Sequence, residues 1–104
     1  MPDRIDHFRE KVDQFPANPL FKFSLGQELF EDNMLDEAII HFNACLVANP
    51  NWMMAALFLA KSHQAAGNKE LAIENFQRTI RLAQDQNHDD PLAEAEDMLS
   101  ELLA

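Results

Sequence analysis

The fold is decided by the stretch Leu25-Gly26-Gln27-Glu28-Leu29, followed by Ala38-Ile39-Ile40-His41-Phe42 and closed by Asn49-Pro50. Apolar residues in each half recur three or four positions apart, which predicts two amphipathic helices in succession. Gly26 falls in the middle of the first helix, where glycine costs about 1 kcal/mol relative to alanine. Its presence there indicates that a second helix approaches closely. Pro50 ends the second helix, because the residue before a proline is disfavoured in the helical conformation.

The same pattern returns along the chain at a fixed offset of 34 residues. Such self-similarity is typical of repeat architectures, in which the same residue types return because the same packing contacts return. Four series follow the offset: Ile5, Ile39 and Ile73; Phe8, Phe42 and Phe76; Val12, Leu46 and Ile80; and Pro16 with Pro50.

Length and composition predict a single all-α domain. The chain has 104 residues, of which 47% are hydrophobic and 25% charged, and these values are those of a folded globular domain. It contains only two glycines, and the helix-forming residues Ala, Leu, Glu and Gln are abundant. We therefore expect one domain, residues 1–104, that is built from helices.

Charge and cysteine usage argue against several classes of partner. Eighteen acids against eight bases give a net charge of −10, and such a surface repels nucleic acids and anionic membranes. Cys45 is the single cysteine, so an intramolecular disulfide is impossible. The first residues lack the pattern of a signal peptide, and no apolar run approaches the roughly 20 residues of a membrane span. These features predict a cytoplasmic protein that binds neither nucleic acid nor membranes.

Apolar spacing, prolines and cap residues predict six helices. Asn18 and Pro19 are a favourable N-cap and first helical residue, and Asn33 and Gly67 both tolerate the left-handed conformation that ends a helix. Gln84 takes the position of the terminal proline in the second repeat, so we expect the helix there to extend by about a turn. The predicted helices cover residues 3–15, 19–32 and 36–48, two more within residues 53–86, and a last one from Pro91 onward.

The chain resembles a tetratricopeptide repeat (TPR) protein. The family's signature positions are matched by Leu25, Gly26, Leu29, Ala38, Phe42 and Pro50 in one copy and by Leu59, Ala60, Ala72 and Phe76 in the next. The resemblance implies antiparallel helix pairs stacked as a right-handed superhelix of about six helices. It divides the chain into an N-terminal half repeat (3–16), repeat one (19–52), repeat two (53–86) and a C-terminal capping helix (90–104).

Several positions depart from the family pattern. Lys22 and Ala56 replace the usual tryptophan, and Leu29 and His63 replace the tyrosine. Thr79 stands where a small apolar residue is common. Small and large sites nevertheless alternate as they do in the family, so we expect the fold to be kept.

The resemblance implies that a partner binds on the concave surface formed by the first helix of each pair. The family's carboxylate clamp, which grips acidic chaperone tails, is missing because Phe23, Gln27 and Phe58 occupy its positions. The mapped surface is instead an apolar groove with Lys61 and Glu31 at its edge. The residues predicted to line this groove are Leu20, Phe23, Gln27, Phe30, Met54, Leu57, Lys61 and Gln64.

Exposed apolar surface of this kind usually marks an interface. We therefore expect a protein-interaction module that binds an apolar segment of a partner protein or peptide. Two alternatives stay open: the chain's own final helix covers the groove, or a second copy covers it in a homodimeric scaffold. The acidic run from Asp85 onward could serve as a docking strip for a basic partner, but the interpretation as a solvated face is preferred.

No constellation of residues predicts catalysis or metal binding. His7 and His41 stand one period apart, but no carboxylate or cysteine completes a tetrahedral metal site by spacing. His63 and Cys45 fall at core positions, and no glycine-rich phosphate loop occurs. We expect no enzymatic activity, no cofactor and no metal.

Overall fold

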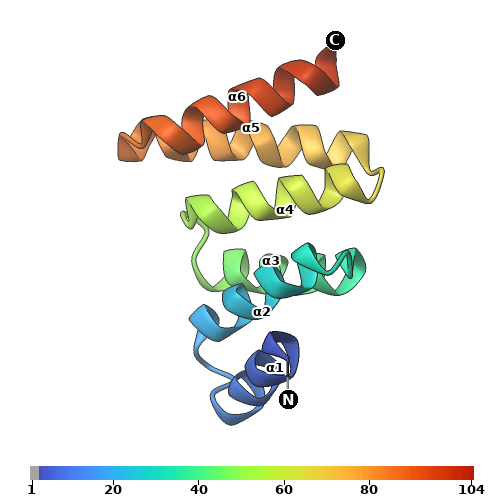
Figure 1. Ribbon diagram of the computed structural model, residues 1–104. Coiled ribbons are helices and arrows are strands. Elements are labelled where there is room, and N and C mark those ends of the chain that lie inside the picture. The colour runs from blue at the N-terminus through green and yellow to red at the C-terminus, as the bar shows by residue number, and fades with distance from the viewer. Residues whose placement is uncertain (1–2) are drawn as a thin grey trace.

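A computed structural model describes residues 3–104 of the chain. In this range the chain forms helices and turns without any strand, so the predicted all-α fold of about six helices is confirmed. Among these residues, no helix combines the length and the apolar character needed to cross a membrane. The helices are α1 (Arg4–Gln14), α2 (Pro19–Glu31), α3 (Leu35–Ala48), α4 (Met53–Ala65), α5 (Lys69–Gln86) and α6 (Asp89–Leu103) (Figure 1).

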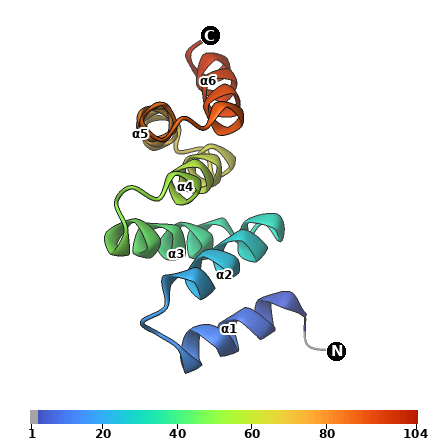
Figure 2. The same cartoon turned by 90° about the vertical axis from the view of Figure 1, so that its left-hand side faces the viewer.

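The helices stack in chain order, and each one packs against the next (Figures 1 and 2). The resulting shape is elongated and measures 42 × 27 × 20 Å. α2, α4 and α6 lie on the side that faces the viewer in Figure 1, while α3 and α5 lie behind them. Because α4 also contacts both α2 and α6, these three helices form one continuous surface.

The turns inside the two helix pairs use the residues that the sequence indicates. Asn33, which follows α2, has a φ of 61°, and Gly67, which follows α4, has a φ of 83°. This left-handed conformation directs the next N–H back over the helix end, so that Met34 N–H donates to Leu29 O at 2.8 Å and Asn68 N–H makes the equivalent bond. The predicted left-handed turns are confirmed.

The connection between α5 and α6 is shorter than the sequence suggests. α5 has 18 residues against 14 in α3, which confirms the predicted extra turn. Only Asn87 and His88 separate α5 from α6, however, because Asn87 has a φ of 58° and reverses the chain at once. α6 therefore begins two residues before Pro91, which lies in its first turn, where no backbone N–H is needed.

Phe42 is the centre of the first core. Its ring is fully buried, and its centroid lies 5.8 Å from that of Phe23 and 5.6 Å from that of Phe58, so it joins α2, α3 and α4. A Cβ atom on Gly26 would lie 2.7 Å from Cε1 of Phe42. The close helix approach predicted from Gly26 is thus confirmed, because the glycine leaves the space that the ring occupies.

Phe76 has the same role in the second repeat. It is fully buried, and it shares a cluster with Ala60 of α4 and Ala72 of α5, both of which are also fully buried. Ala95 of α6 completes the cluster and has no exposed surface. α6 therefore packs on the second repeat through this cluster, and its capping role stays a prediction.

Buried polar groups in the second repeat are satisfied within their own helices. Thr79 Oγ1 donates to Asn75 O at 2.8 Å, and Asn75 Nδ2 donates to Leu71 O at 2.8 Å. Ser62 Oγ donates to Phe58 O at 2.7 Å in the same way. Such bonds to the carbonyl four residues earlier explain how Thr79 occupies a small apolar position of the repeat. Throughout residues 3–104, no buried side-chain nitrogen or oxygen lacks a partner.

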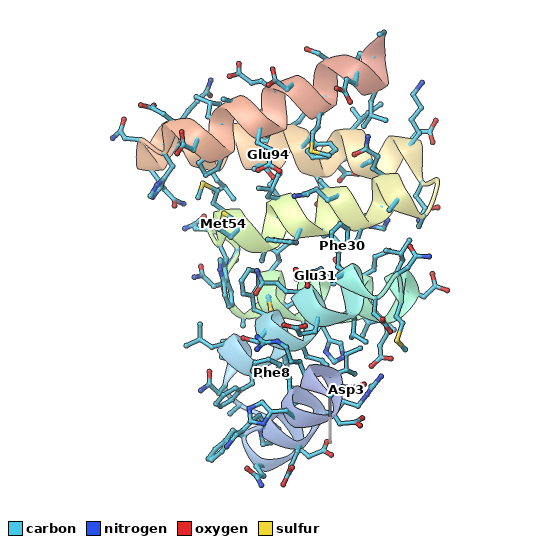
Figure 3. The ribbon with its side chains drawn as sticks, in the orientation of Figure 1. Asp3, Phe8, Phe30, Glu31, Met54 and Glu94 are labelled. Carbon is cyan, nitrogen blue, oxygen red and sulfur yellow. The ribbon has the colours of Figure 1, made fainter. Side chains whose placement is uncertain are left out.

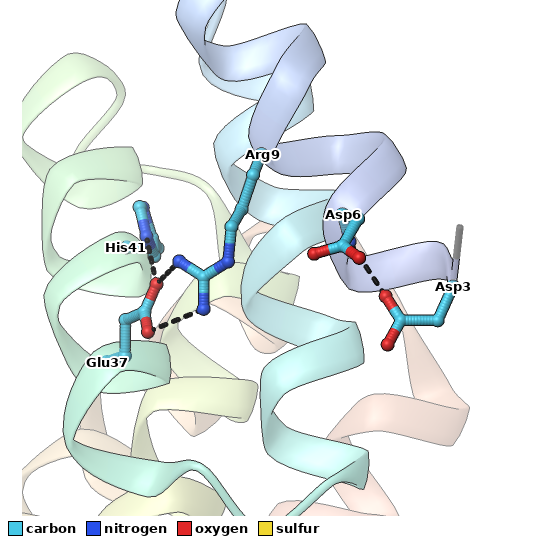
Figure 4. A network of polar contacts seen from close by, with 5 residues as sticks. All are labelled: Asp3, Asp6, Arg9, Glu37 and His41. Carbon is cyan, nitrogen blue, oxygen red and sulfur yellow. Dashed lines mark hydrogen bonds and ion pairs between the residues drawn. The ribbon is translucent and has the colours of Figure 1, made fainter. Parts of the chain in front are cut away.

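α1 has no fully buried residue, and an ion pair reinforces its packing. Arg9 donates from both Nη atoms to the carboxylate of Glu37 on α3, with Nη2 and Oε1 2.9 Å apart (Figure 4). Glu37 Oε2 also lies 3.6 Å from Nε2 of His41. The hydrogen bonds from Arg9 lower the pKa of Glu37, although partial burial of the carboxylate opposes this effect.

We expect Gly26→Ala to lower the free energy of unfolding by about 1–2 kcal/mol, because overpacking costs roughly 1–3 kcal/mol while alanine regains about 1 kcal/mol of helix propensity. Urea unfolding followed by circular dichroism measures the change. In a Phe42→Leu background the ring is gone, so the same substitution should be neutral or stabilising. Equal destabilisation in both backgrounds would contradict the explanation by close approach.

Replacing Glu37 with Gln should make the free energy of unfolding depend less on pH in the acidic range. The folded pKa of Glu37 is below its unfolded value, so the pair adds stability above about pH 4.5 that is lost as pH falls through the folded pKa. Between about pH 5 and pH 3 the wild type should therefore lose more free energy of unfolding than Glu37→Gln. Glu96→Gln, at an exposed position of α6, is the control and should retain the wild-type slope.

Candidate functional site

Seven of the eight residues predicted to line a groove have accessible surface on α2 and α4. Along each helix they recur at intervals of three, four or seven residues, which places them along one side. Leu20 is 61% exposed, and the others are half-buried. We call this surface the α2/α4 face; it comprises Leu20, Phe23, Gln27 and Phe30 of α2 and Met54, Lys61 and Gln64 of α4.

Aromatic packing supports the α2/α4 face from below. The ring of Phe23 lies 4.9 Å from that of Trp52 and 5.8 Å from that of Phe58, measured between centroids. Phe30 meets the same Phe58 ring edge to face at 5.8 Å. Phe23 and Phe30 therefore hold α2 against α4 while they present their outer edges to solvent. Trp52 packs at the junction of the two repeats.

Leu57 does not belong to the accessible surface, and its predicted role in the groove is wrong. It is only 1% exposed and shares a cluster with Phe76 and Ala95. The reason is the position of α6, which packs on the α4–α5 pair and covers this part of α4. One alternative from the sequence, coverage by the final helix, is thus correct for this position.

α6 also reaches Lys61, the one cation of the α2/α4 face. Lys61 Nζ lies 2.9 Å from Glu94 Oε2 and 5.1 Å from the centroid of the Phe58 ring. Figure 3 shows Glu94 on α6 directed toward α4. The two side chains keep 24% and 44% of their surface exposed, and such pairs contribute about 0.2–1 kcal/mol. Lys61 is therefore neutralised by a weak partner within the chain.

The α2/α4 face is formed by side chains of two neighbouring helices. Four hollows in the described surface are lined by other residues, for example by Asp3, Arg4, Glu28 and Glu31 between α1 and α2. Arg4 Nε and Glu28 Oε1 pair there at 2.6 Å. A partner of the α2/α4 face would lie across the helices instead of entering a deep cavity.

His41, His63 and Cys45 have structural surroundings. Among residues 3–104, no three His, Cys, Asp or Glu side chains are grouped so that they could hold a metal ion. Burial is the main cause that lowers the pKa of both His41 and His63, and Asn68 Nδ2 lies 3.1 Å from Nδ1 of His63. Cys45 is fully buried, and burial raises its pKa to about 11, so the thiol stays protonated at neutral pH. The predicted core positions of His63 and Cys45 are confirmed.

Two residues that contact this site are not among those predicted from the sequence to belong to it. Phe58 lies under both Phe30 and Lys61, and Glu94 binds Lys61 from another helix. In the sequence Phe58 occupies a clamp position of the family, but this does not indicate that the ring supports Phe30 and Lys61. The spacing of Glu94 from other acids of α6 is a detectable signal, but its contact with α4 depends on how the helices stack.

The structure is similar to those of solved proteins over most of the chain. A protein from Bordetella parapertussis, solved in solution, has a TM-score of 0.87 and 24% identity, and the match covers 99% of this chain and 90% of that one. A solution structure of a tetratricopeptide repeat domain protein from Salinibacter ruber has a TM-score of 0.74 and 20% identity, with 84% and 88% covered. A crystal structure of a tetratricopeptide repeat domain protein from the same organism also has a TM-score of 0.74, at 19% identity, and the match covers 82% of this chain and 94% of that one.

No protein-family model and no curated protein matches the sequence. The structural matches lie below 25% identity, so they establish the arrangement of the helices and nothing finer. The arrangement of six antiparallel helices in a stack agrees with these matches. The chain has the fold of the tetratricopeptide repeat proteins.

Proposed function

We propose that this protein is a non-catalytic interaction module that holds an apolar segment of a partner protein on the α2/α4 face. The observation that carries the proposal is the accessible apolar surface of Leu20, Phe30 and Met54 on adjacent helices. Partly accessible aromatic and methionine side chains on a rigid base are typical anchors of protein interfaces. Gln27 and Gln64 lie beside them and can donate or accept hydrogen bonds that orient a partner backbone.

The proposed partner is a protein, and the proposed location is the cytoplasm. The net charge of −10 opposes nucleic acids and anionic membranes. The single cysteine is a buried free thiol, which suits a reducing compartment. The partner segment gains affinity by covering apolar surface, and Lys61 becomes available to it when the weak pair with Glu94 opens.

A homodimer in which a second copy covers the α2/α4 face is the competing proposal. Light scattering over a dilution series separates the two. The interaction module should stay monomeric, whereas the homodimer should dissociate on dilution and should be lost when Leu20 and Met54 are replaced.

The double variant Leu20→Gln/Met54→Gln should weaken partner binding at least about tenfold, since two apolar contacts of about 1 kcal/mol each are lost. The partner is first recovered from native extract, identified and purified, and its affinity is then measured by calorimetry. Ile40→Gln/Val47→Gln is the matched control, because these apolar residues are 65% and 85% exposed on α3. An equal loss in both variants, or no loss in the first, would remove the α2/α4 face as the binding site.

A further inference from the structure

α6 presents a continuous line of acids to solvent. The acids stand at positions i, i+4, i+7 and i+11, a spacing that puts them on one side of a helix. Their side chains are exposed, and Glu94 retains 44% of its surface although it pairs with Lys61. We call this line the acidic stripe; it consists of Asp90, Glu94, Asp97 and Glu101.

The direction of the acidic stripe is given by Glu94. Because Glu94 Oε2 is 2.9 Å from Lys61 Nζ, the acidic stripe meets α4, and with it the α2/α4 face, at Glu94. Figure 3 shows Glu94 and Met54 on the same side of the molecule as Phe30. Apolar surface on α2 and α4 thus adjoins negative charge on α6.

Most of the charged side chains along this border are acidic. Residues 89–103, which form α6, include six acids and no Lys or Arg. Lys61 is the single cation of the α2/α4 face, and Glu94 already neutralises it. Glu31, at the far border on α2, adds another exposed acid. The α2/α4 face and the acidic stripe therefore offer a partner negative charge, and their one positive charge is already paired.

We propose that the occupant of the α2/α4 face is a cationic amphipathic helix of a partner protein, an inference that rests on the function proposed above. Its apolar side lies on Leu20, Phe30 and Met54, and its lysines or arginines, three or four residues apart, face the acidic stripe. The stripe covers 12 residues, and its first and last acids lie about 16 Å apart along the helix, which matches a helix of about three turns.

Other occupants fit the charges poorly. A second copy of this chain brings a net charge of −10 and an acidic stripe of its own, so the two copies repel each other. Nucleic acids and anionic membranes are repelled for the same reason. An incoming lysine meets Glu94 at little cost, because the Lys61–Glu94 pair is exposed and weak.

The first test uses synthetic peptides of about 14 residues that share one apolar side and carry Lys, Gln or Glu on the other. Fluorescence anisotropy is measured at about 50 mM and about 500 mM salt. The Lys peptide should bind at least about tenfold tighter than the Gln peptide at low salt, and the difference should shrink at high salt. If wild-type protein bound none of the peptides, or bound Gln and Lys peptides equally, the inference would be overturned.

The second test separates the acidic stripe from the overall charge. The variant Asp90→Asn/Glu94→Gln/Asp97→Asn/Glu101→Gln should bind the Lys peptide about tenfold more weakly, or weaker still. The control Glu10→Gln/Asp13→Asn/Glu70→Gln/Asp85→Asn removes four exposed acids elsewhere and should stay within about twofold of wild type. Equal losses would mean general attraction to an acidic protein and would overturn the inference. If the fourfold stripe variant lost helicity, Asp97→Asn/Glu101→Gln would replace it.

The variant Leu20→Gln/Met54→Gln distinguishes failure of the inference from failure of the proposed function. If this variant and the stripe variant both lose binding of the Lys peptide, the inference and the proposed function are both supported. Tight binding of the Gln peptide that is lost in Leu20→Gln/Met54→Gln keeps the function and rejects the cationic partner. Binding of the Lys peptide that needs the stripe but not Leu20 and Met54 would reject the α2/α4 face, and both proposals with it.

Discussion

The contact between Gly26 and the ring of Phe42 is the constraint on which the rest of the structure depends. The ring fills the space that a Cβ on residue 26 would occupy, and it also touches Phe23 and Phe58. One side chain therefore sets the distance between α2 and α3 and the placement of α4 on both. Because Phe23 and Phe58 support the α2/α4 face, the contact that holds the repeats together also shapes the proposed binding surface.

α6 links the stability of the stack to its surface properties. Its inner side buries Ala95 and covers Leu57, so it completes the second core. Its outer side carries the acidic stripe and places Glu94 on Lys61. Helices at the ends of repeat arrays bury one side and keep the other polar. In this protein the polar side adjoins apolar surface, which is the basis for inferring a cationic amphipathic partner.

Residues that depart from the repeat pattern are accommodated by contacts with neighbouring residues. Thr79 returns its hydroxyl to Asn75 O within α5, so a polar atom is buried at little cost. His63, in place of a tyrosine, remains a half-polar ring with Asn68 beside it. Arg9 and Glu37 reinforce α1, whose residues are nowhere fully buried, with hydrogen bonds between α1 and α3. None of these substitutions changes the order in which the helices stack.

The sequence by itself determined the helices, their turns and their pairing, because these follow from local signals: apolar periodicity, prolines, Asn33 and Gly67, and the 34-residue offset. It also indicated the seven residues of the α2/α4 face, since their spacing puts them on one side of a helix. The burial of Leu57 and the pairing of Lys61 with Glu94 were decided only by the tertiary structure. Both depend on where α6 docks, and docking is set by the two-residue turn at Asn87 and by the fit of Ala95 into the second core. Both contacts join residues more than 30 positions apart, and the apolar periodicity within each helix does not set how two helices pack against each other.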